Sequence, residues 1–361
     1  MSNGGVVRRP AVPAPVRIRR DVSKLTGDPI LVFYEKAIEK MKQGNRLDLA
    51  TSWRYQAAIH DYPPKDNITP ADRRNFPGGG DPFASSTDIL PSGPERDKFW
   101  GRCQHHCWFF LPWHRGYLLF FERIIAKIVA NMPGGPKDWA LPYWNYSNSA
   151  ADALLPKPFQ TAQIDDPDKP GTKKNNNLHV PQRVAAANAG TAFLSGADTN
   201  LNCLKVPTDP AQGFGDNLGA SFGGGKTEHH SFTGGREGAL EITPHDAVHG
   251  ALGQGGGFMN GFTTAPLDPI FWLHHCNIDR LWEVWIQRQK QLGVLKRNPN
   301  PATNTAAADK TLDQTWLDLV FDFHDEDGKA VTIRSKDLMD TRVAPLSYEY
   351  EDTSDPFKGA K

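Results

Sequence analysis

The chain has 361 residues, and its 41 lysines and arginines are balanced by 41 aspartates and glutamates, so the formal net charge is zero. A chain without net positive charge has no general attraction for nucleic acid or acidic lipid, and we expect no nucleic-acid partner. No stretch approaches the roughly 20 consecutive apolar residues of a membrane span, which excludes a transmembrane protein.

The first residues lack the apolar core of a secretory signal, so we expect either a cytoplasmic protein or an exported one whose signal has been removed. The four cysteines are too few and too scattered to form a disulfide framework in a chain of this length. The sequence therefore leaves the compartment open.

The N-terminal part is predicted to be an extended arm followed by a helix. Prolines in residues 1–24 disfavour a helix, and apolar residues there alternate with charged ones. Asp28 and Pro29 then provide a cap and a first-turn proline, and an apolar pattern of helical spacing continues to Gly44. A shorter helical pattern over residues 49–60 ends in His60.

Three further helices are predicted downstream. One begins near Pro112 and continues until Pro133. A short one opens at Thr243 and Pro244, and the longest covers residues 270–291 after an Asp268–Pro269 start.

The segments between and after these helices are predicted to be less regular. Residues 152–238 are rich in Gly, Asn, Asp, Thr and Pro and offer little to bury, so we interpret them as a loop insertion rather than a domain. Short strands are predicted at residues 317–320, 331–333 and 348–350. We expect residues 1–361 to form one domain, with residues 345–361 as the end of its core.

Eight of the 12 histidines lie in strongly apolar, aromatic sequence. They are His60, His105, His106, His114, His245, His249, His274 and His275. Burying several imidazoles together without partners costs desolvation free energy for each ring, and a bound metal removes that cost. This concentration of buried histidines therefore indicates a metal site.

The spacing of these histidines suggests two sets of three. His245 and His249 are four residues apart and lie on one face of a helix, and the His274–His275 pair offers a third ligand. Upstream, His114 and the His105–His106 pair lie in one apolar stretch, with His60 at the end of an earlier helix. Three neutral imidazoles suit copper or zinc and leave a coordination position open. The residues alone do not choose within either adjacent pair.

The stretches around these histidines resemble the type 3 dicopper family, which comprises tyrosinases, catechol oxidases and molluscan-type haemocyanins. The matching stretches are 52–60 (SWRYQAAIH), 103–115 (CQHHCWFFLPWHR), 245–250 (HDAVHG) and 268–282 (DPIFWLHHCNIDRLW). The resemblance implies a mainly α fold, in which a four-helix bundle houses a dicopper centre among long loops and a few short peripheral strands.

The resemblance also assigns ligands. His60, His105 and His114 would hold one copper ion, and His245, His249 and His275 the other. His274 would lie behind the ligands in the second shell, and His106 would be passed over for His105. Cys103 would form a thioether with His105; the alternative is that Cys103 and Cys107 are small buried hydrophobic residues.

Other residues receive roles from the same resemblance. Glu241 would hold a water beside the second copper ion, although a helix N-terminal acid is the structural alternative. Asp246 would help to orient that water at a position where strong hydroxylases often have Asn. Asp279 and Arg280 would form a buried ion pair that supports the bundle. Gly250, Phe258 and Met259 would border the substrate entrance.

The implied activity is oxidation of o-diphenols to o-quinones with O2 as co-substrate, together with ortho-hydroxylation of monophenols. The expected partner is a small phenol, and a copper-delivery protein is possible; the sequence indicates no oligomeric state. The alternatives are a catechol oxidase without hydroxylation, a haemocyanin-like oxygen carrier, a zinc hydrolase and a helical interaction module. Since the chain ends soon after Tyr350, we expect the site to lack a covering domain.

Overall fold

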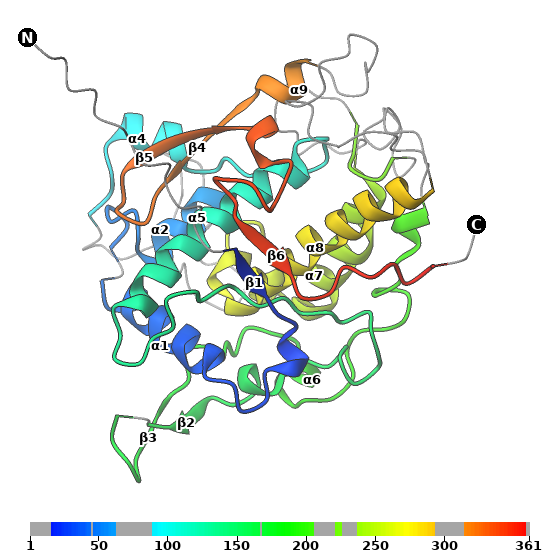
Figure 1. The fold of residues 1–361 in the computed structure, drawn as a ribbon. Coiled ribbons are helices and arrows are strands. Elements are labelled where there is room, and N and C mark those ends of the chain that lie inside the picture. Colours follow the sequence, from blue (N-terminus) through cyan, green and yellow to red (C-terminus); the bar gives the residue numbers. More distant parts are fainter. Residues whose placement is uncertain are drawn as a thin grey trace, which may run out of the picture.

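The computed structural model of the chain describes residues 16–44, 46–62, 89–166, 168–205, 221–225, 237–292 and 314–358 (Figure 1). Most of the predicted N-terminal arm and parts of the predicted insertion fall outside these ranges. None of the helices in the described ranges has the length and apolar character needed to cross a membrane.

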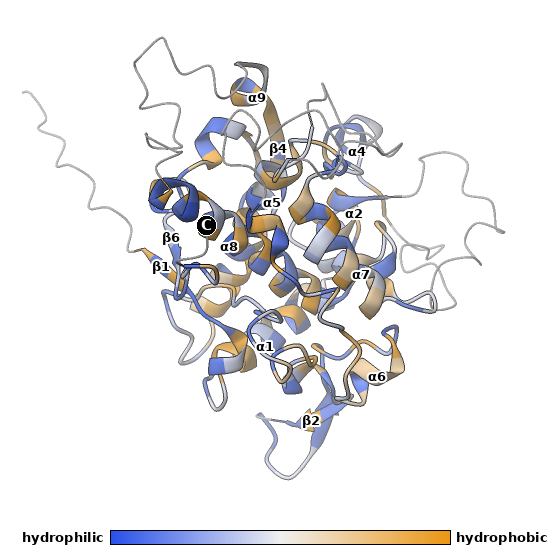
Figure 2. Ribbon diagram, turned by 90° about the vertical axis from the view of Figure 1, so that its right-hand side faces the viewer, coloured by the Kyte–Doolittle hydropathy of each residue, from blue (hydrophilic) through white to orange (hydrophobic). Residues whose placement is uncertain are grey.

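Two long helices form the centre of the fold. Helix α5 (Phe110–Ala130) packs against α8 (Pro269–Gln291), and both are buried on most sides. The start of α8 is the predicted one, because the Asp268 carboxylate accepts the Ile270 N–H at 3.1 Å and Pro269 occupies the first turn. Helix α5 begins two residues before the expected Pro112. Figure 2 shows hydrophobic segments among these central helices.

Two further helices pack beside this pair. Helix α1 (Ile30–Gln43) contacts α5 and α2 (Trp53–His60). The Ser52 hydroxyl caps α2 by accepting the Tyr55 N–H at 3.2 Å, and the helix ends at His60 as predicted. The cap therefore fixes the helix whose last residue is a candidate ligand.

The segment that carries His245 and His249 is helical after Thr243, as predicted, and a helical turn also precedes that residue. Helical backbone already forms around Glu241–Asp246 and continues as α7 (Ala247–Leu252), but Thr243 interrupts it with φ −147° and ψ 121°. A residue that precedes proline is pushed out of the helical region by the proline ring, which accounts for the kink.

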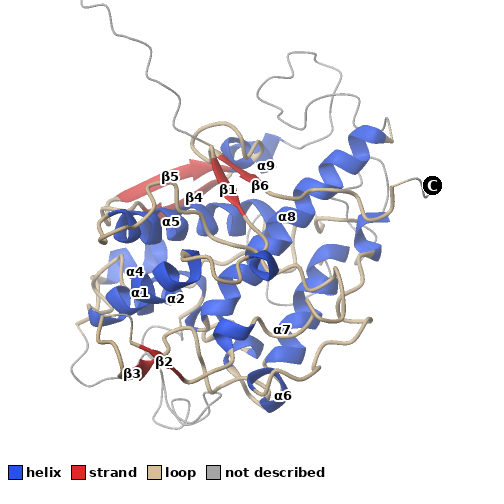
Figure 3. Ribbon diagram, turned by 60° about the horizontal axis from the view of Figure 1, so that its bottom comes forward, coloured by secondary structure: helices blue, strands red, loops and turns tan. Residues whose placement is uncertain are grey.

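The described strands form three two-stranded pairs. Strand β1 (Arg17–Arg19) is parallel to β6 (Tyr348–Tyr350), β2 (Gln163–Asp165) is antiparallel to β3 (Lys173–Asn175), and β4 (Val320–His324) is antiparallel to β5 (Ala330–Arg334). Figure 3 shows β2–β3 on the opposite side of the helices from the other two pairs. The strand predicted at 317–320 was misplaced, since its first two residues belong to helix α9 (Gln314–Asp318).

The remaining described elements are short. They are α4 (Gly93–Phe99), α6 (Ala185–Asn188) and single helical turns at Val22–Lys24, Lys157–Phe159, Asn202–Lys205, Phe258–Asn260, Ala265–Leu267 and Ser335–Leu338.

The expectation that residues 152–238 bury little was wrong. Phe159, Leu178 and Leu204 of this segment are buried in the same hydrophobic core as the central helices. Arg183 is also buried, and its guanidinium bonds both carboxylate oxygens of Asp268 at 2.6 and 2.7 Å. The sequence pattern missed this contribution because the buried residues come singly, between turns, rather than at helical or strand spacing.

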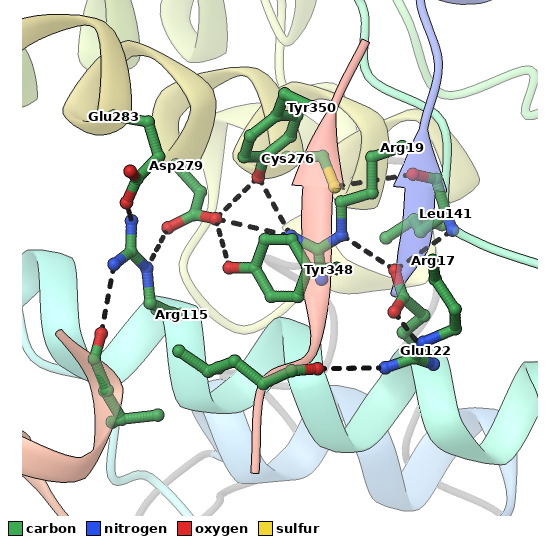
Figure 4. A network of polar contacts seen from close by, with 12 residues as sticks. Arg17, Arg19, Arg115, Glu122, Leu141, Cys276, Asp279, Glu283, Tyr348 and Tyr350 are labelled. Carbon is green, nitrogen blue, oxygen red and sulfur yellow. Dashed lines mark hydrogen bonds and ion pairs between the residues drawn. The ribbon is translucent and has the colours of Figure 1, made fainter. Parts of the chain in front are cut away.

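Asp279 has different partners from the predicted one. Its carboxylate accepts hydrogen bonds from Arg115, Arg19, Tyr348 and Tyr350, at 2.5 to 3.3 Å (Figure 4). Arg280, expected to pair with Asp279, instead bonds Asn277, Asn145 and the Asp352 carbonyl. Residues i and i+1 on a helix point in different directions, so the adjacent pair does not meet. Asp279 thereby ties β1 and β6 to the two central helices.

Candidate metal centre

The first histidine cluster joins the end of α2 to the start of α5. His60 ends α2, His105 lies in the loop before α5, and His114 lies in the first turns of α5. Their exposed fractions are only 2 to 3%. The Nε2 atoms of His60 and His114 are 3.5 Å apart, and the His105 ring centroid lies 5.2 Å from His60 and 4.9 Å from His114.

The second cluster joins the kinked segment, α7 and α8. The Nε2 atoms of His249 and His275 are 3.2 Å apart. The His245 ring centroid lies 4.6 Å from that of His249 and 4.9 Å from that of His275. The structure therefore assembles both sets of three that the sequence predicted.

The two clusters lie face to face. The rings of His114 and His275 stack with centroids 4.6 Å apart and planes at 14°. His105 and His245 are 5.7 Å apart by the same measure, and His60 and His275 are 6.5 Å apart. Two ions held by the two clusters would therefore be neighbours, and one small molecule could contact both.

Hydrogen bonds prepare these rings to bind metal through Nε2. The Nδ1 atoms of His60, His114 and His249 lie 2.6 to 2.8 Å from the backbone carbonyls of Phe262, Phe110 and Met259. A carbonyl only accepts, so each Nδ1 carries the proton and each Nε2 presents a lone pair. In the first cluster two such lone pairs face each other at 3.5 Å, an arrangement that a cation between them would stabilise.

Burial favours the neutral form of three of the candidate ligand rings. Desolvation, reinforced by the neighbouring histidines, holds the pKa of His114 and of His275 well below the usual value and lowers the pKa of His249 to about 3. A neutral imidazole is the form that coordinates a metal. The site therefore offers ligands without first having to release protons at neutral pH.

His274 and His275 have different positions although they are adjacent. The ring of His275 stacks against the first cluster, whereas the ring of His274 lies 5.7 Å from that of Tyr146. His274 is fully buried, and neither of its ring nitrogens has a hydrogen-bond partner in the described part of the chain. Its ligand atom is within 4.8 Å of those of the second cluster. His274 therefore lies beside the second cluster, while the stacking contact with His114 of the first cluster is made by His275.

A cavity of about 300 Å³ opens beside the two clusters. Its described lining consists of His60, His105, His106, His245, Asp246, His249, Gly250, Met259, Asn260, Gly261, Phe262 and Ala265. Of the predicted entrance residues, Gly250 and Met259 line the cavity, but Phe258 does not and instead packs on the core. Phe258 is half-buried, whereas its neighbour Met259 is almost fully buried.

The sequence reasoning missed Phe262, an exposed aromatic residue that lines the cavity beside the first cluster. Its ring is 39% exposed and lies 4.8 Å from the His105 ring and 6.4 Å from the His60 ring. Its carbonyl also accepts the bond from His60 Nδ1. The sequence offered no signal that separates Phe262 from Phe258, since both follow glycine.

Glu241 lies buried beside this cavity. Its Oε1 accepts the His106 backbone N–H at 2.7 Å, while its Oε2 has no hydrogen-bond partner within the described ranges. Burial, then the nearby Asp246 carboxylate, raises the pKa of Glu241 well above its usual value. His106 reaches Glu241 through a left-handed backbone conformation, with φ +56°. The raised pKa makes the Glu241 carboxylate a stronger base than an exposed glutamate.

Asp246 contacts a ligand directly. Its Oδ1 lies 2.7 Å from Nδ1 of His245, and its side chain is 42% exposed. A carboxylate that accepts from the distal nitrogen of a ligand imidazole fixes the ring orientation and increases its basicity. The sequence predicted a role towards water but not this bond.

Cys103 lies beside the first cluster. Its side chain is fully buried, and its sulfur is within 4.8 Å of the ligand nitrogens of His60 and His105. Burial raises the pKa of the Cys103 thiol well above its usual value. The thiol is therefore protonated in the described state and close to the ring it was predicted to join.

Comparison with known proteins agrees with this arrangement. Residues 50–288 match the family described as "Common central domain of tyrosinase", and residues 310–361 match the "Polyphenol oxidase middle domain". Tyrosinase HcTyr1 of Hahella sp. (strain CCB-MM4) is 37% identical over 340 residues, covering 93% of this chain and 63% of the relative. Polyphenol oxidase II of Ipomoea batatas is 32% identical over 270 residues, covering 71% of this chain but only 40% of the relative.

Solved structures share the fold. Latent apple tyrosinase superposes with a TM-score of 0.61 at 26% identity, covering 97% of this chain and 66% of the other. The polyphenol oxidase of Grenache (Vitis vinifera) gives 0.59 at 26% identity, covering 96% and 87%. A copper-bound tyrosinase of Aspergillus oryzae gives 0.53 at 21% identity, covering 95% and 94%, and shows the fold alone.

The predicted fold class and family are thus confirmed, and the paired histidine clusters fit the copper cofactor expected from them. The chain spans about three fifths of the length of the bacterial relative and less of the plant enzyme. On the match over residues 50–288, the chain belongs to the tyrosinase and polyphenol oxidase family.

Proposed function

We propose that the chain is a dicopper phenol oxidase that converts o-diphenols to o-quinones and hydroxylates monophenols. His60, His105 and His114 would hold one copper ion, and His245, His249 and His275 the other. The observation that carries the proposal is that these two sets face each other, with His114 and His275 stacked at 4.6 Å. We further propose that the described ranges belong to one catalytic domain.

The cofactor would supply the redox chemistry of this reaction. Copper ions held by the two histidine clusters would supply electron transfer to O2, and the overall reaction converts two o-diphenols and one O2 to two o-quinones and two waters. The protein contributes neutral ligands fixed through Nδ1 and a cavity whose floor is formed by buried side chains. Phe262, beside His60 and His105, offers a ring face or edge against which a substrate ring can pack.

Hydroxylation of a monophenol needs a base, and Glu241 is the candidate. A monophenol and O2 give an o-quinone and water, and the phenol first loses its proton. Glu241 Oε2 is buried without a partner in the described residues, and could receive that proton through one water. The His106 N–H donates to Oε1 at 2.7 Å, so Oε1 is occupied and Oε2 is the oxygen left to accept the proton.

A catechol oxidase without hydroxylation is the second candidate. The bond between Asp246 Oδ1 and His245 favours it, because this oxygen is then not available to orient a water beside Glu241. An asparagine at this position would present an N–H group as well as an oxygen. The relative rates on monophenols and diphenols separate the two candidates.

We also propose that Cys103 becomes linked to His105 by a thioether when copper is loaded. The distance of less than 4.8 Å between their ligand atoms supports this. The oxidant would be O2 at the copper site, and the bond removes two hydrogens. An intact mass lower by about 2 Da after loading, absent in Cys103→Ala, checks the proposal.

The deciding experiment is to load the purified chain with copper, count the ions and follow O2 uptake with 4-methylcatechol and with 4-methylphenol. We expect two copper ions per chain and turnover of both substrates. Turnover of 4-methylcatechol alone would select the catechol oxidase. Reversible O2 binding without turnover would select an oxygen carrier, and zinc uptake without copper uptake would overturn the proposal.

A further inference from the structure

We propose that the cavity beside the histidine clusters selects phenols whose side chain carries a positive charge, such as an aminoethyl group, over phenols that carry a carboxylate. The inference rests on the proposed phenol oxidase function and concerns the substrate class of that site. It follows from which charges line the cavity and where they lie.

The cavity has an acidic side chain and, within its described lining, no lysine or arginine. Asp246 is the acidic one, and its side chain is 42% exposed. The other described lining residues outside the histidines are apolar, glycine or Asn260. A substrate in this cavity therefore meets a carboxylate without a compensating basic side chain from these residues.

Asp246 lines the cavity and its side chain is 42% exposed, so its carboxylate is accessible to a substituent of a bound substrate. The phenol oxygen must lie at the facing histidines, so a substituent para to it points towards the open side of the cavity. Asp246 follows His245 directly, and the 2.7 Å bond from His245 Nδ1 holds one carboxylate oxygen. Nearly half of the side chain remains exposed to receive a partner.

A second carboxylate lies close to the first. Glu237 has its Oε1 3.1 Å from Nε2 of the cavity residue His106, and the two side chains are 21% and 17% exposed. Asp246 and Glu237 both act on the buried Glu241 as like charges, which places the three carboxyl groups in one region. The potential at this side of the cavity is therefore negative, and a cationic group is attracted there.

Positive charge from bound copper would not lie beside the substituent of the substrate. Copper ions would lie among the histidines, where the phenol oxygen binds, and not beside the para substituent. The His106 ring is the other group that can carry positive charge at the cavity, and Glu237 faces it. Neither offers a carboxylate-bearing substituent the fixed, two-pronged partner that an arginine would provide.

The test compares three o-diphenols on the copper-loaded enzyme: dopamine, 4-methylcatechol and 3,4-dihydroxyphenylacetate. They present a cationic, a neutral and an anionic substituent on the same reacting ring. We expect kcat/KM for dopamine to exceed that for 3,4-dihydroxyphenylacetate by roughly tenfold, and the ratio to fall as salt is added, since these charges are partly exposed.

Two variants assign the effect to residues. Asp246→Asn and Glu237→Gln should each lower the dopamine to 3,4-dihydroxyphenylacetate ratio by roughly three- to fivefold. The ratio within one variant cancels any general loss of turnover that Asp246→Asn causes. Glu349→Gln, an exposed residue of β6 that is not among the lining residues, is the matched control and should leave the ratio unchanged.

The outcomes separate the inference from the function on which it rests. If 4-methylcatechol is not oxidised, the proposed function fails. If it is oxidised but the anionic substrate is preferred, or the ratio is the same in the wild type and in both variants, the inference about charge is overturned.

Discussion

His114 and His275 stack face to face, with ring centroids 4.6 Å apart, although 161 positions separate them in the chain and each belongs to a different histidine cluster. One lies near the start of α5 and the other in the first turns of α8. The packing of these two helices therefore sets the separation of the two clusters.

Replacing His249 with alanine should remove one metal ion. The Nε2 of His249 lies 3.2 Å from that of His275, and loss of one of three ligands leaves the second cluster incomplete. We expect about one copper ion instead of two, and diphenol oxidation reduced at least about a hundredfold, since even outer-shell partners account for 10- to 100-fold. Metal analysis and O2 uptake check this. Replacing His179, a half-buried residue outside both clusters, should change neither. Retention of two ions in His249→Ala would show that the ligand assignment is wrong.

Replacing Glu241 with glutamine should reduce monophenol hydroxylation far more than diphenol oxidation. A glutamine keeps the bond from the His106 N–H but cannot accept a proton, so we expect a loss of about 10²- to 10⁴-fold in hydroxylation. Equal losses in both reactions would contradict a role as base.

The pH dependence of hydroxylation tests the same residue. Burial raises the pKa of Glu241, and a base acts only when deprotonated. Hydroxylation should therefore fall as the pH drops through this raised pKa, at a higher pH than an exposed glutamate would give. Rate profiles on 4-methylphenol should show this acidic limb in the wild type, with 4-methylcatechol as the comparison substrate.

Replacing Asp279 with asparagine should destabilise the fold. Two buried arginines, Arg19 and Arg115, would each lose one of their charged partners and keep Glu122 and Glu283 respectively, and breaking a buried pair costs about 3–5 kcal/mol. The free energy of urea unfolding measures the change. The control is Asp165→Asn, because Asp165 is 88% exposed and its ion pair with Lys173 should contribute less than about 1 kcal/mol. Equal stability of the two variants would refute the structural role.

Asp279 also makes the free energy of unfolding depend on pH in the acidic range. Burial alone would raise its pKa, but Arg115 and Arg19 outweigh burial and hold the pKa of Asp279 below its usual value. The contribution is therefore complete above the pKa of an unfolded aspartate, about 3.9, and is lost as the pH falls through the lower folded pKa. Asp279→Asn should lose this part of the acid dependence.

In the metal-free chain, the buried histidines should lower the free energy of unfolding at a higher pH than Asp279 does. Burial lowers the pKa of four histidines, His114, His249, His274 and His275. Between the pKa of an unfolded histidine, about 6.5, and these lower folded pKa values, the unfolded chain binds more protons than the folded chain. Its free energy of unfolding should fall as the pH drops below about 6.5. Urea titrations from pH 7.5 to 5, with and without copper, check this; a flat profile for the metal-free chain would contradict the burial of neutral rings.

Local sequence patterns predicted several elements well. The Asp268–Pro269 cap signal located α8, and the apolar pattern ending in His60 located α2. The Thr243–Pro244 signal likewise marked the start of the helical segment that carries His245 and His249. The core residues of 152–238 were missed, because they are isolated apolar side chains. Phe262 was missed and Phe258 chosen instead, since a glycine-rich run does not indicate which aromatic ring turns outward.

The sequence by itself determined which residue types could bind metal, because imidazoles in apolar surroundings need a partner wherever the chain folds. Only the tertiary structure decided which imidazoles meet. His275 stacks against the first cluster and His274 lies beside the second because successive residues of α8 leave the helix in different directions, and the packing of α8 on α5 selects one of them. In the same way, Asp279 bonds Arg19 of β1 and Arg115 of α5 rather than Arg280, the next residue in the chain.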